Sequence, residues 1–288
     1  MWILYASASA FFAGITAILA KCGMKRTGGT VATAVRTIVV LVFAWLMVFA
    51  KGVAVDFSTI APKTWLFLIL SGLATGASWL CYFEALQLGD VNKVVPIDKS
   101  STVLTVLLAF LLLGETVSFL GVCGVILIAG GTFLMLEKVK QTSGRAEKGH
   151  MWLILAILSA VFAALTAILG KVGISDVNSD LGTAIRTGVV LVMAWMMVFV
   201  TGKTREVSQI PRSELVFICV SGLSTGASWL FYYRALQLGP ASVVVPIDKL
   251  SILITVLFSF FILKEKLTRR SAVGLMLVTL GTLIMTLA

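Results

Sequence analysis

Long apolar runs of about 20 residues alternate with short polar spacers along the whole chain of 288 residues. The runs cover roughly residues 2–20, 31–50, 64–86, 92–113, 117–136, 152–170, 182–200, 214–236, 242–263 and 270–287. An α-helix of about 20 residues crosses a hydrocarbon core of about 30 Å. The runs are continuous rather than alternating in polarity, which excludes the strands of a membrane barrel. We therefore predict an all-α membrane protein with ten transmembrane helices.

The second half of the chain repeats the first. A shift of 150 residues aligns 1–138 with 151–288 without a gap, and 63 of the 138 positions are identical. The segment SGLATGASWLCYFEALQLG at 71–89 returns as SGLSTGASWLFYYRALQLG, and VVPIDK at 94–99 returns unchanged at 244–249. We predict a five-helix domain over 1–138, a polar linker over 139–150 and a second five-helix domain over 151–288.

An odd number of helices in each repeat decides their relative orientation. After five crossings the second copy begins on the opposite side of the membrane, so the two copies are predicted to be inverted repeats. Inverted repeats are typical of secondary transporters, whose substrate site lies where the repeats meet. The repeat therefore indicates a carrier that works by alternating access.

The composition agrees with a membrane protein and excludes several other classes. Hydrophobic residues make up 59% of the chain and charged residues 12%, about half the charged fraction of a soluble domain. The net charge is +10, yet the positive residues lie in short spacers between apolar runs, which argues against nucleic-acid binding.

The charge of the spacers gives one prediction for the orientation of the chain. Most lysines and arginines lie in the spacers after runs 1, 3, 5, 7 and 9. The positive-inside rule places that side, including the linker, in the cytoplasm and both termini outside.

Ionisable residues inside the apolar runs are the candidate functional residues, because charge within a membrane is costly and tends to mark a transport pathway. In the first half these residues are Arg36, Glu84, Asp98 and Lys99. In the second half they are Arg186, Arg234, Asp248 and Lys249. Their depth predicts two charged layers that flank a less polar centre.

Two interpretations of these charges remain open. In the first, Arg36 pairs with Asp98 and Arg186 with Asp248 to make insertion tolerable, while the two lysines reach the headgroups. In the second, Arg36 and Arg186 hold a substrate carboxylate. Asp98 and Asp248 carry a proton or cation, and the neighbouring Lys99 and Lys249 tune the pKa values of these aspartates. The second layer has a surplus of two positive charges, which favours an anionic solute.

Other residues in the runs also have two interpretations. Trp79 and Trp229 lie far from the interfacial belt, and either line the substrate cavity or pack between helices. Pro96 and Pro246 precede the Asp-Lys pairs, and either loosen the helix or occupy its first turn. The pairs Gly72–Gly76 and Gly222–Gly226 predict close helix packing.

The sequence shows no sign of enzymatic chemistry or of a cofactor. His150 is the single histidine and lies in the linker, and no nucleotide-binding loop or CxxC pair is present. We therefore predict a protein that is not an enzyme and that uses no cofactor and no metal.

The chain resembles the EamA-domain family of the drug/metabolite transporter superfamily. The resemblance rests on LLLGETVSFLGVCGVILIAGGTFL at 111–134 and ILKEKLTRRSAVGLMLVTLGTLI at 262–284, where Glu115 and Glu265 match the family's Gly-Glu step and Lys264 replaces its glycine. It implies ten helices in two repeats, a central cavity, and export or exchange of small metabolites without ATP. It also implies cytoplasmic termini, opposite to the charge count, so orientation stays open.

Together these observations predict a secondary transporter of a small polar metabolite, such as an amino acid or organic acid, in the cell membrane. Its expected partners are the lipid bilayer, the substrate and a coupling ion such as the proton, and it is expected to be a monomer or homodimer. A passive channel and a lipid flippase or scramblase are the alternatives. An intramembrane enzyme fits least, because no nucleophile has an adjacent base.

Overall fold

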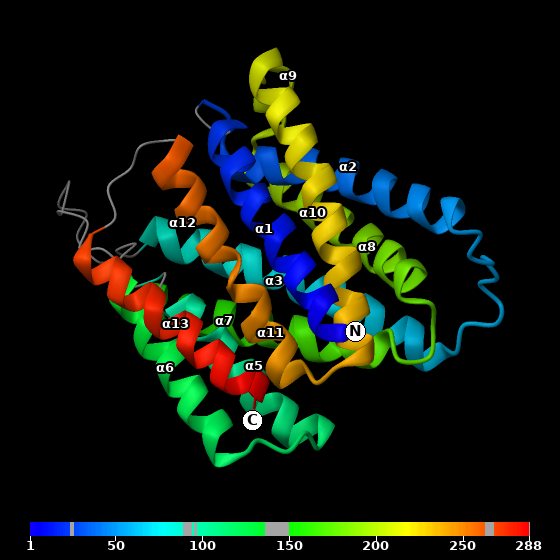
Figure 1. The fold of residues 1–288 in the computed structure, drawn as a ribbon. Helices are drawn as coiled ribbons and strands as arrows, with labels where there is room; N and C mark the ends of the chain where they lie inside the picture. The colour runs from blue at the N-terminus through cyan, green and yellow to red at the C-terminus, as the bar shows by residue number, and fades with distance from the viewer. Residues whose placement is uncertain (24–25, 89–93, 95–96, 136–149, 263–267, 288) are drawn as a thin grey trace. The chain divides into compact units, whose positions relative to one another are not determined.

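The computed structural model describes residues 1–288 except 24–25, 89–93, 95–96, 136–149, 263–267 and 288. Within that part of the chain every element is an α-helix (Figure 1). The helices are α1 (Trp2–Gly23), α2 (Gly29–Ala50), α3 (Pro62–Leu88), α5 (Ser101–Leu113), α6 (Phe119–Met135), α7 (Met151–Gly173), α8 (Ser179–Val200), α9 (Thr204–Ser208), α10 (Arg212–Leu238), α11 (Ala241–Lys249), α12 (Ser251–Ile262) and α13 (Arg269–Leu287). The predicted linker, apart from His150, lies outside the described residues.

Eight segments of the described chain are long and apolar enough to cross a membrane. They correspond to all of the predicted runs except the fourth and fifth. In those two, the described helices are α5 with 13 residues and α6 with 17 residues, and residues 92–93, 95–96 and 136 of these runs lie outside the described part of the chain. The chain is therefore an all-helical, multi-pass membrane protein, and the number of ten crossings stays a prediction.

The fourth run of each repeat is interrupted just after its Asp-Lys pair, where the sequence predicted one continuous helix. In the second repeat α11 ends at Lys249, and the Leu250 N–H donates to the carbonyl of Ile247 at 2.9 Å. In the first repeat the Ser100 N–H donates to the carbonyl of Ile97 at 3.1 Å. Bonds to the third preceding residue are those of a tighter helical turn. The break thus recurs at the equivalent place in both repeats.

A proline lies upstream of the break in the second repeat. Pro246 lies within α11, five residues after its start at Ala241, and not in the first helical turn. A proline inside a helix has no N–H to donate and its ring crowds the preceding turn, which weakens the helix at that point. The structure thus places this proline beyond the first turn, and the loosening of the helix stays a prediction. Pro96, its counterpart, lies outside the described residues.

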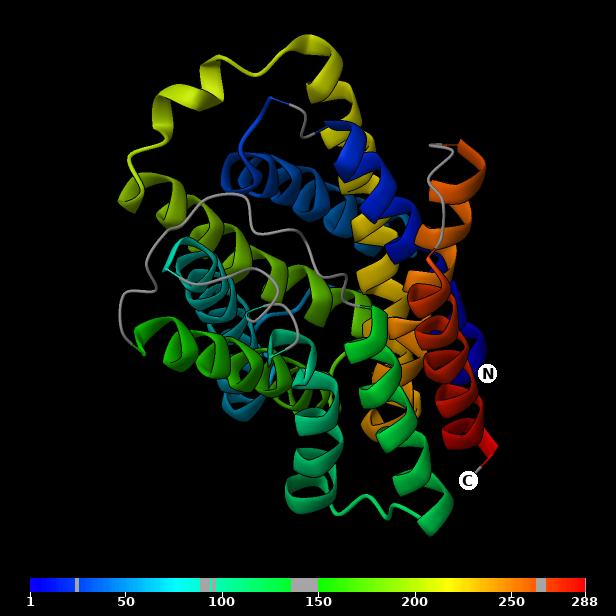
Figure 2. The ribbon, with the colours of Figure 1, turned by 90° about the vertical axis from the view of Figure 1, so that its left-hand side faces the viewer.

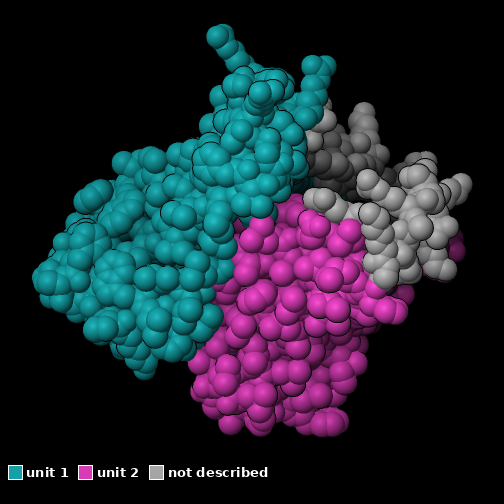
Figure 3. Space-filling model, turned by 180° about the vertical axis from the view of Figure 1, so that it is seen from behind, with its two compact units in different colours: residues 1–73, 169–239, 247–264 teal, residues 74–168, 240–246, 265–288 magenta. Residues whose placement is uncertain are grey.

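The described helices gather into two compact units, coloured separately in Figure 3. The first unit contains 1–73, 169–239 and 247–264, and the second contains 74–168, 240–246 and 265–288. Within the first unit α1 packs along α10 and α2 packs against both α8 and α10. Within the second unit α6 and α13 lie side by side (Figures 1 and 2). Each unit combines segments of both repeats.

Two glycines at equivalent positions let helices of the first unit approach closely. A Cβ atom on Gly222 of α10 would lie 2.7 Å from the Cβ of Val39 and 3.0 Å from the carbonyl oxygen of Arg36, both on α2. A Cβ atom on Gly72 of α3 would lie 2.7 Å from the Cβ of Val189 on α8. These distances are shorter than side chains tolerate, so small residues are required here. The predicted packing role of these glycines is confirmed.

The second unit uses glycine in the same way. A Cβ on Gly124 of α6 would lie 2.7 Å from the carbonyl oxygen of Gly281 on α13, and a Cβ on Gly131 would lie 2.5 Å from that of Gly274. Because 124 and 131 are the repeat counterparts of 274 and 281, the two helices meet through the same pair of positions. The backbones of the two helices therefore approach closely along this seam, and Ile128 and Met285 pack beside it.

Glu115 caps the N-terminus of α11. Its carboxylate accepts the Ala241 N–H at 2.7 Å and the Ser242 N–H at 2.8 Å, through one oxygen each. These N–H groups have no acceptor inside the helix, and a negative charge at a helix N-terminus is favoured by the helix dipole. Glu115 therefore fixes the start of α11, the helix that ends at Lys249.

Replacing Gly222 with alanine is expected to destabilise the protein. The added methyl group must push α10 away from α2, at a cost on the order of 1–3 kcal/mol, and should lower the midpoint of thermal unfolding in detergent. Gly188 is the matched control, because a Cβ there meets nothing within 4 Å. If Gly222→Ala unfolded at the same temperature as Gly188→Ala, the close approach would not be needed.

Replacing Glu115 with alanine is expected to cost about 1 kcal/mol, because two N–H groups lose their acceptor. Glu115→Gln keeps one oxygen acceptor and should retain part of the effect. The midpoint temperature of thermal unfolding is measured for both variants. Glu206→Ala on the exposed α9 is the control. Equal unfolding temperatures for Glu115→Ala and Glu206→Ala would contradict the cap.

Candidate functional site

Arg186 of α8 lies inside the first unit and is only 2% exposed. Its Nε donates to the Ser71 hydroxyl of α3 at 2.9 Å. Its guanidinium carbon lies 5.2 Å from the centre of the Trp229 ring and 4.8 Å from that of Tyr233, both on α10. Aromatic faces stabilise a desolvated cation. The structure thus brings two of the predicted site residues, Arg186 and Trp229, into contact.

Asp248 takes part in a hydrogen-bonded network that joins the two repeats. The Ser9 hydroxyl of α1 donates to its Oδ1 at 2.7 Å. The Ser228 hydroxyl of α10 donates in turn to the carbonyl oxygen of Ser9 at 3.1 Å. Ser9 belongs to the first repeat, whereas Asp248 and Ser228 belong to the second. The aspartate therefore ties the end of α11 to a helix of the other repeat.

The second unit contains the repeat counterpart of this network. The Ser159 hydroxyl of α7 donates to Asp98 Oδ1 at 2.7 Å, and the Ser78 hydroxyl of α3 donates to the carbonyl oxygen of Ser159 at 3.1 Å. Here the bridging serine belongs to the second repeat and the aspartate to the first. The two networks share residue types, spacing and distances, so each repeat supplies a serine to the aspartate of the other.

Sequence reasoning missed these four serines. The signal was available, because Ser9 and Ser78 recur as Ser159 and Ser228 at equivalent positions inside apolar runs. A hydroxyl there needs a partner, since an unsatisfied polar group in an apolar setting costs free energy. Sequence alone does not say which helix provides the partner.

The lysines beside the aspartates differ in their surroundings. Lys99 is exposed, and its Nζ lies 3.8 Å from Asp98 Oδ2. It lines a small hollow of about 250 Å³ between α5 and α6 with mostly apolar walls. Lys249 is half-buried. Both lysines follow their aspartates in the chain at the point where the helix breaks.

The remaining predicted residues of the first layer are less enclosed. The Arg36 Nη2 donates to the Thr33 hydroxyl on the preceding turn of α2 at 3.3 Å. Trp79 is half-buried in α3, and Glu84 is exposed near its end. Arg36 belongs to the first unit and Asp98 to the second, so their pairing stays a prediction, as do the two charged layers.

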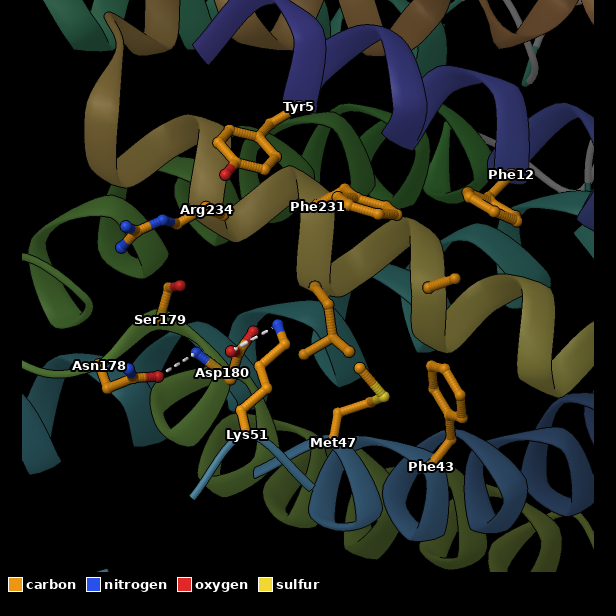
Figure 4. A pocket seen from close by; sticks show the side chains of 12 residues that line it. Tyr5, Phe12, Phe43, Met47, Lys51, Asn178, Ser179, Asp180, Phe231 and Arg234 are labelled. Carbon is orange, nitrogen blue, oxygen red and sulfur yellow. Dashed lines mark hydrogen bonds and ion pairs between the residues drawn. The ribbon is translucent and has the colours of Figure 1, made fainter. Parts of the chain in front are cut away.

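A cavity of about 480 Å³ opens within the first unit (Figure 4). Four helices build it, namely α1, α2, α8 and α10. Arg234 is the one predicted site residue in its wall. The lining residues are Tyr5, Phe12, Phe43, Met47, Lys51, Asn178, Ser179, Asp180, Ala227, Leu230, Phe231 and Arg234.

One end of the cavity is polar. Lys51 Nζ and Asp180 Oδ2 form an ion pair at 2.8 Å, which links the end of α2 to the first turn of α8. The Asn178 side-chain oxygen caps α8 by accepting the Asp180 N–H at 2.9 Å. Arg234 Nη1 donates to the Gln237 side-chain oxygen at 2.6 Å. In Figure 4, Lys51, Asp180 and Arg234 lie toward one side of the cavity, with the ring of Tyr5 near Arg234, and Phe12 and Phe43 lie toward the other side.

The other end of the cavity is aromatic. The rings of Phe12 and Phe231 stack at 5.8 Å between centroids with 13° between their planes. Tyr5 stacks on the opposite side of this pair, 6.1 Å from Phe231. Phe43 and Met47 complete the apolar wall from α2. A cavity with one polar and one aromatic end suits an amphipathic organic molecule.

In the described residues no cluster of three or more His, Cys, Asp or Glu side chains is placed to hold a metal ion.

Comparisons with known proteins agree with this architecture. The sequence pattern of the EamA-like transporter family matches residues 1–137 and again residues 150–287. A Sinorhizobium protein described as an uncharacterized transporter in the cobO 3′ region is 46% identical over 134 residues, which are 46% of this chain and 95% of the relative. An uncharacterized protein of Methanocaldococcus jannaschii is 26% identical over 136 residues, 47% of this chain and 96% of the relative. Both relatives are thus about the length of one repeat.

A solved structure shows the same fold over nearly the whole chain. The crystal structure of a protein 18% identical in sequence matches with a TM-score of 0.78 and covers 99% of this chain and 98% of that chain. The two repeats each match the family, and the resemblance seen in the sequence is confirmed. The chain belongs to the EamA-like transporter family, and it is a multi-pass membrane protein with two EamA repeats.

Proposed function

We propose that the protein is a secondary carrier of a small polar metabolite, such as an amino acid or organic acid, in the cell membrane. The observation that carries this proposal is the pair of equivalent Asp–Ser networks. Each network joins an aspartate at a helix break to a serine of the other repeat. Discontinuous helices at the junction of inverted repeats are where secondary transporters bind substrates and coupling ions.

Asp98 and Asp248 are the proposed coupling groups. An ionised aspartate accepts the serine hydroxyl strongly, and a protonated or cation-bound aspartate is a weaker acceptor. Loading the carboxylate would therefore loosen the bond to Ser159 or Ser9, which joins one repeat to the other. This links ion binding to movement of the repeats, as coupled transport requires. Lys99 and Lys249 are proposed to tune the two carboxylates.

Arg36 and Arg186 are proposed to hold a substrate carboxylate during the transport cycle. Arg186 is enclosed by Trp229 and Tyr233 in the described conformation. A substrate would reach it only after these rings move, so its role belongs to another stage of the cycle. Trp79 and Trp229 are proposed to wall the pathway. The transport direction is not part of the proposal.

The double variant Asp98→Asn with Asp248→Asn tests the coupling role. Purified protein in liposomes is screened with amino acids, organic acids and organic cations under a proton gradient, with an internal pH dye and radiolabelled solute. We expect saturable, proton-linked uptake of at least one class by the unmodified protein. In the double variant, gradient-driven uptake should fall at least tenfold and lose its pH dependence, because asparagine does not carry a proton.

Asp56→Asn is the matched control for this experiment. Asp56 lies in the exposed connection between α2 and α3, where hydrogen bonds from Ser58 lower the pKa of its carboxyl. A lowered pKa keeps this group ionised between about pH 5.5 and 8, so it cannot cause a pH dependence in that range. The double variant with unchanged proton-driven uptake would contradict the coupling role. Flux without saturation would indicate a channel, and lipid movement between leaflets a flippase.

A further inference from the structure

We propose that the cavity of the first unit binds an organic monoanion with an apolar tail. Its carboxylate would sit on Arg234, and its tail between the Phe12–Phe231 pair and Phe43. This inference names the substrate class of the proposed carrier and rests on that function only for the transport of the ligand, not for its binding. The site differs from the predicted one, in which Arg36 and Arg186 hold the carboxylate.

The polar end of the cavity lies at the ends of its helices. Lys51 directly follows α2, Asp180 is in the first turn of α8 and Arg234 is in the last turns of α10. In a spanning helix these positions are near the membrane surface. Phe43 lies eight residues before Lys51, and Phe12 seven residues after Tyr5, so both are about two helical turns deeper. The cavity thus runs from a charged mouth to an aromatic interior.

The charges of the mouth favour an anion. Lys51 and Asp180 neutralise each other in their ion pair. The structure gives Arg234 a neutral partner, the amide oxygen of Gln237. The three charged residues of the lining therefore leave one positive charge, and a guanidinium matches the geometry of a carboxylate. A free ammonium group would find its acidic partner, Asp180, already engaged by Lys51, so a monoanion is preferred to a zwitterion or a cation.

The interior favours an apolar tail of limited size. Its walls are aromatic rings, Met47 and Leu230, and a thioether chain adapts to different shapes. A volume of about 480 Å³ lies in the range of small-molecule sites. Burial of apolar surface contributes roughly 25 cal/mol for each Å², so a ring or short alkyl chain adds affinity that a bare carboxylate lacks.

The repeat itself shows that the fold does not require these charges. At the equivalent positions of the other copy, Arg234 corresponds to Glu84 and Phe231 to Cys81. Lys51 and Asp180 correspond to Thr201 and Thr30. Neighbouring positions of the same helices are unchanged, for example Ala77 and Ala227. Because the same framework forms with other residues at these points, the charged mouth is a property of one copy, as expected for a ligand site.

Four matched compounds test the ligand class. Calorimetric titration of the purified protein in detergent uses 3-phenylpropionate, its neutral amide, 3-phenylpropylamine and propionate. We expect saturable binding of 3-phenylpropionate and at least tenfold weaker binding of the other three, which lack the charge, reverse it or lack the tail. A tenfold difference in Kd corresponds to about 1.4 kcal/mol. Equal or tighter binding of the amine, or of propionate, would overturn the proposal.

Substitutions of Arg234 and Phe231 test the roles of these two cavity residues. Arg234→Glu and Phe231→Cys introduce the residues that the other repeat has at these positions. Arg234→Glu and Arg234→Gln should weaken binding of 3-phenylpropionate at least tenfold, while Arg234→Lys should retain part of it. Phe231→Cys should weaken 3-phenylpropionate and leave the weak binding of propionate unchanged. Arg205→Gln, on the exposed α9, is the control and should bind as the unmodified protein does. Thermal unfolding without ligand identifies any variant that does not fold. If Arg234→Glu does not fold, the milder variant Arg234→Lys still tests the arginine.

The outcomes separate this inference from the proposed function. Binding that depends on Arg234, without any carrier activity in liposomes, would support the cavity and contradict the carrier. Carrier activity that depends on Asp98 and Asp248, with 3-phenylpropionate bound equally by the Arg234→Gln variant, would support the carrier and overturn the cavity.

Discussion

A polar group inside an apolar helix bundle must find a hydrogen-bond partner within the protein, and the structure depends on this constraint. Water is absent from the hydrocarbon core, so an unbonded hydroxyl or carboxylate there costs several kcal/mol. Ser9 meets the requirement for Asp248, and Ser159 meets it for Asp98. Because each bond joins residues of different repeats, local satisfaction also connects the two copies.

The helix break after each Asp-Lys pair determines where the aspartates that bond Ser9 and Ser159 lie in their helices. A continuous helix would bury the aspartate among satisfied backbone groups, whereas a break leaves the carboxylate at the end of a short helix whose start is fixed by Glu115. This also explains the Gly-Glu step that carried the family resemblance. The glutamate is distant in sequence from α11, yet its two oxygens satisfy the first N–H groups of that helix. In the first copy this glutamate is thus a helix cap, whereas Lys264 and Glu265 of the second copy lie outside the described residues.

The sequence predicted the features that follow from local pattern. Apolar runs, the repeat and the small residues at Gly72 and Gly222 each depend on neighbours along the chain or on a shift of 150 residues. Contacts between helices could not be obtained that way. The depth of Arg186 was predicted from the sequence, but its contacts with Trp229 and Tyr233 were not, because the facing helix is set by tertiary structure. The cavity around Arg234 needs four helices at once, so no pattern within one helix reveals it.

Repeated and unrepeated residues would serve two different requirements of the proposed carrier. Exchange of conformations between inverted halves requires equivalent contacts in both, and the two Asp–Ser networks provide them with the same bond length of 2.7 Å. A substrate with one charged end has the opposite requirement. If both copies offered an arginine at the position of Arg234, the molecule could bind in two opposed orientations. In the proposed carrier, Glu84 at the equivalent position would remove that ambiguity, so two equivalent aspartate networks would be combined with one asymmetric binding site.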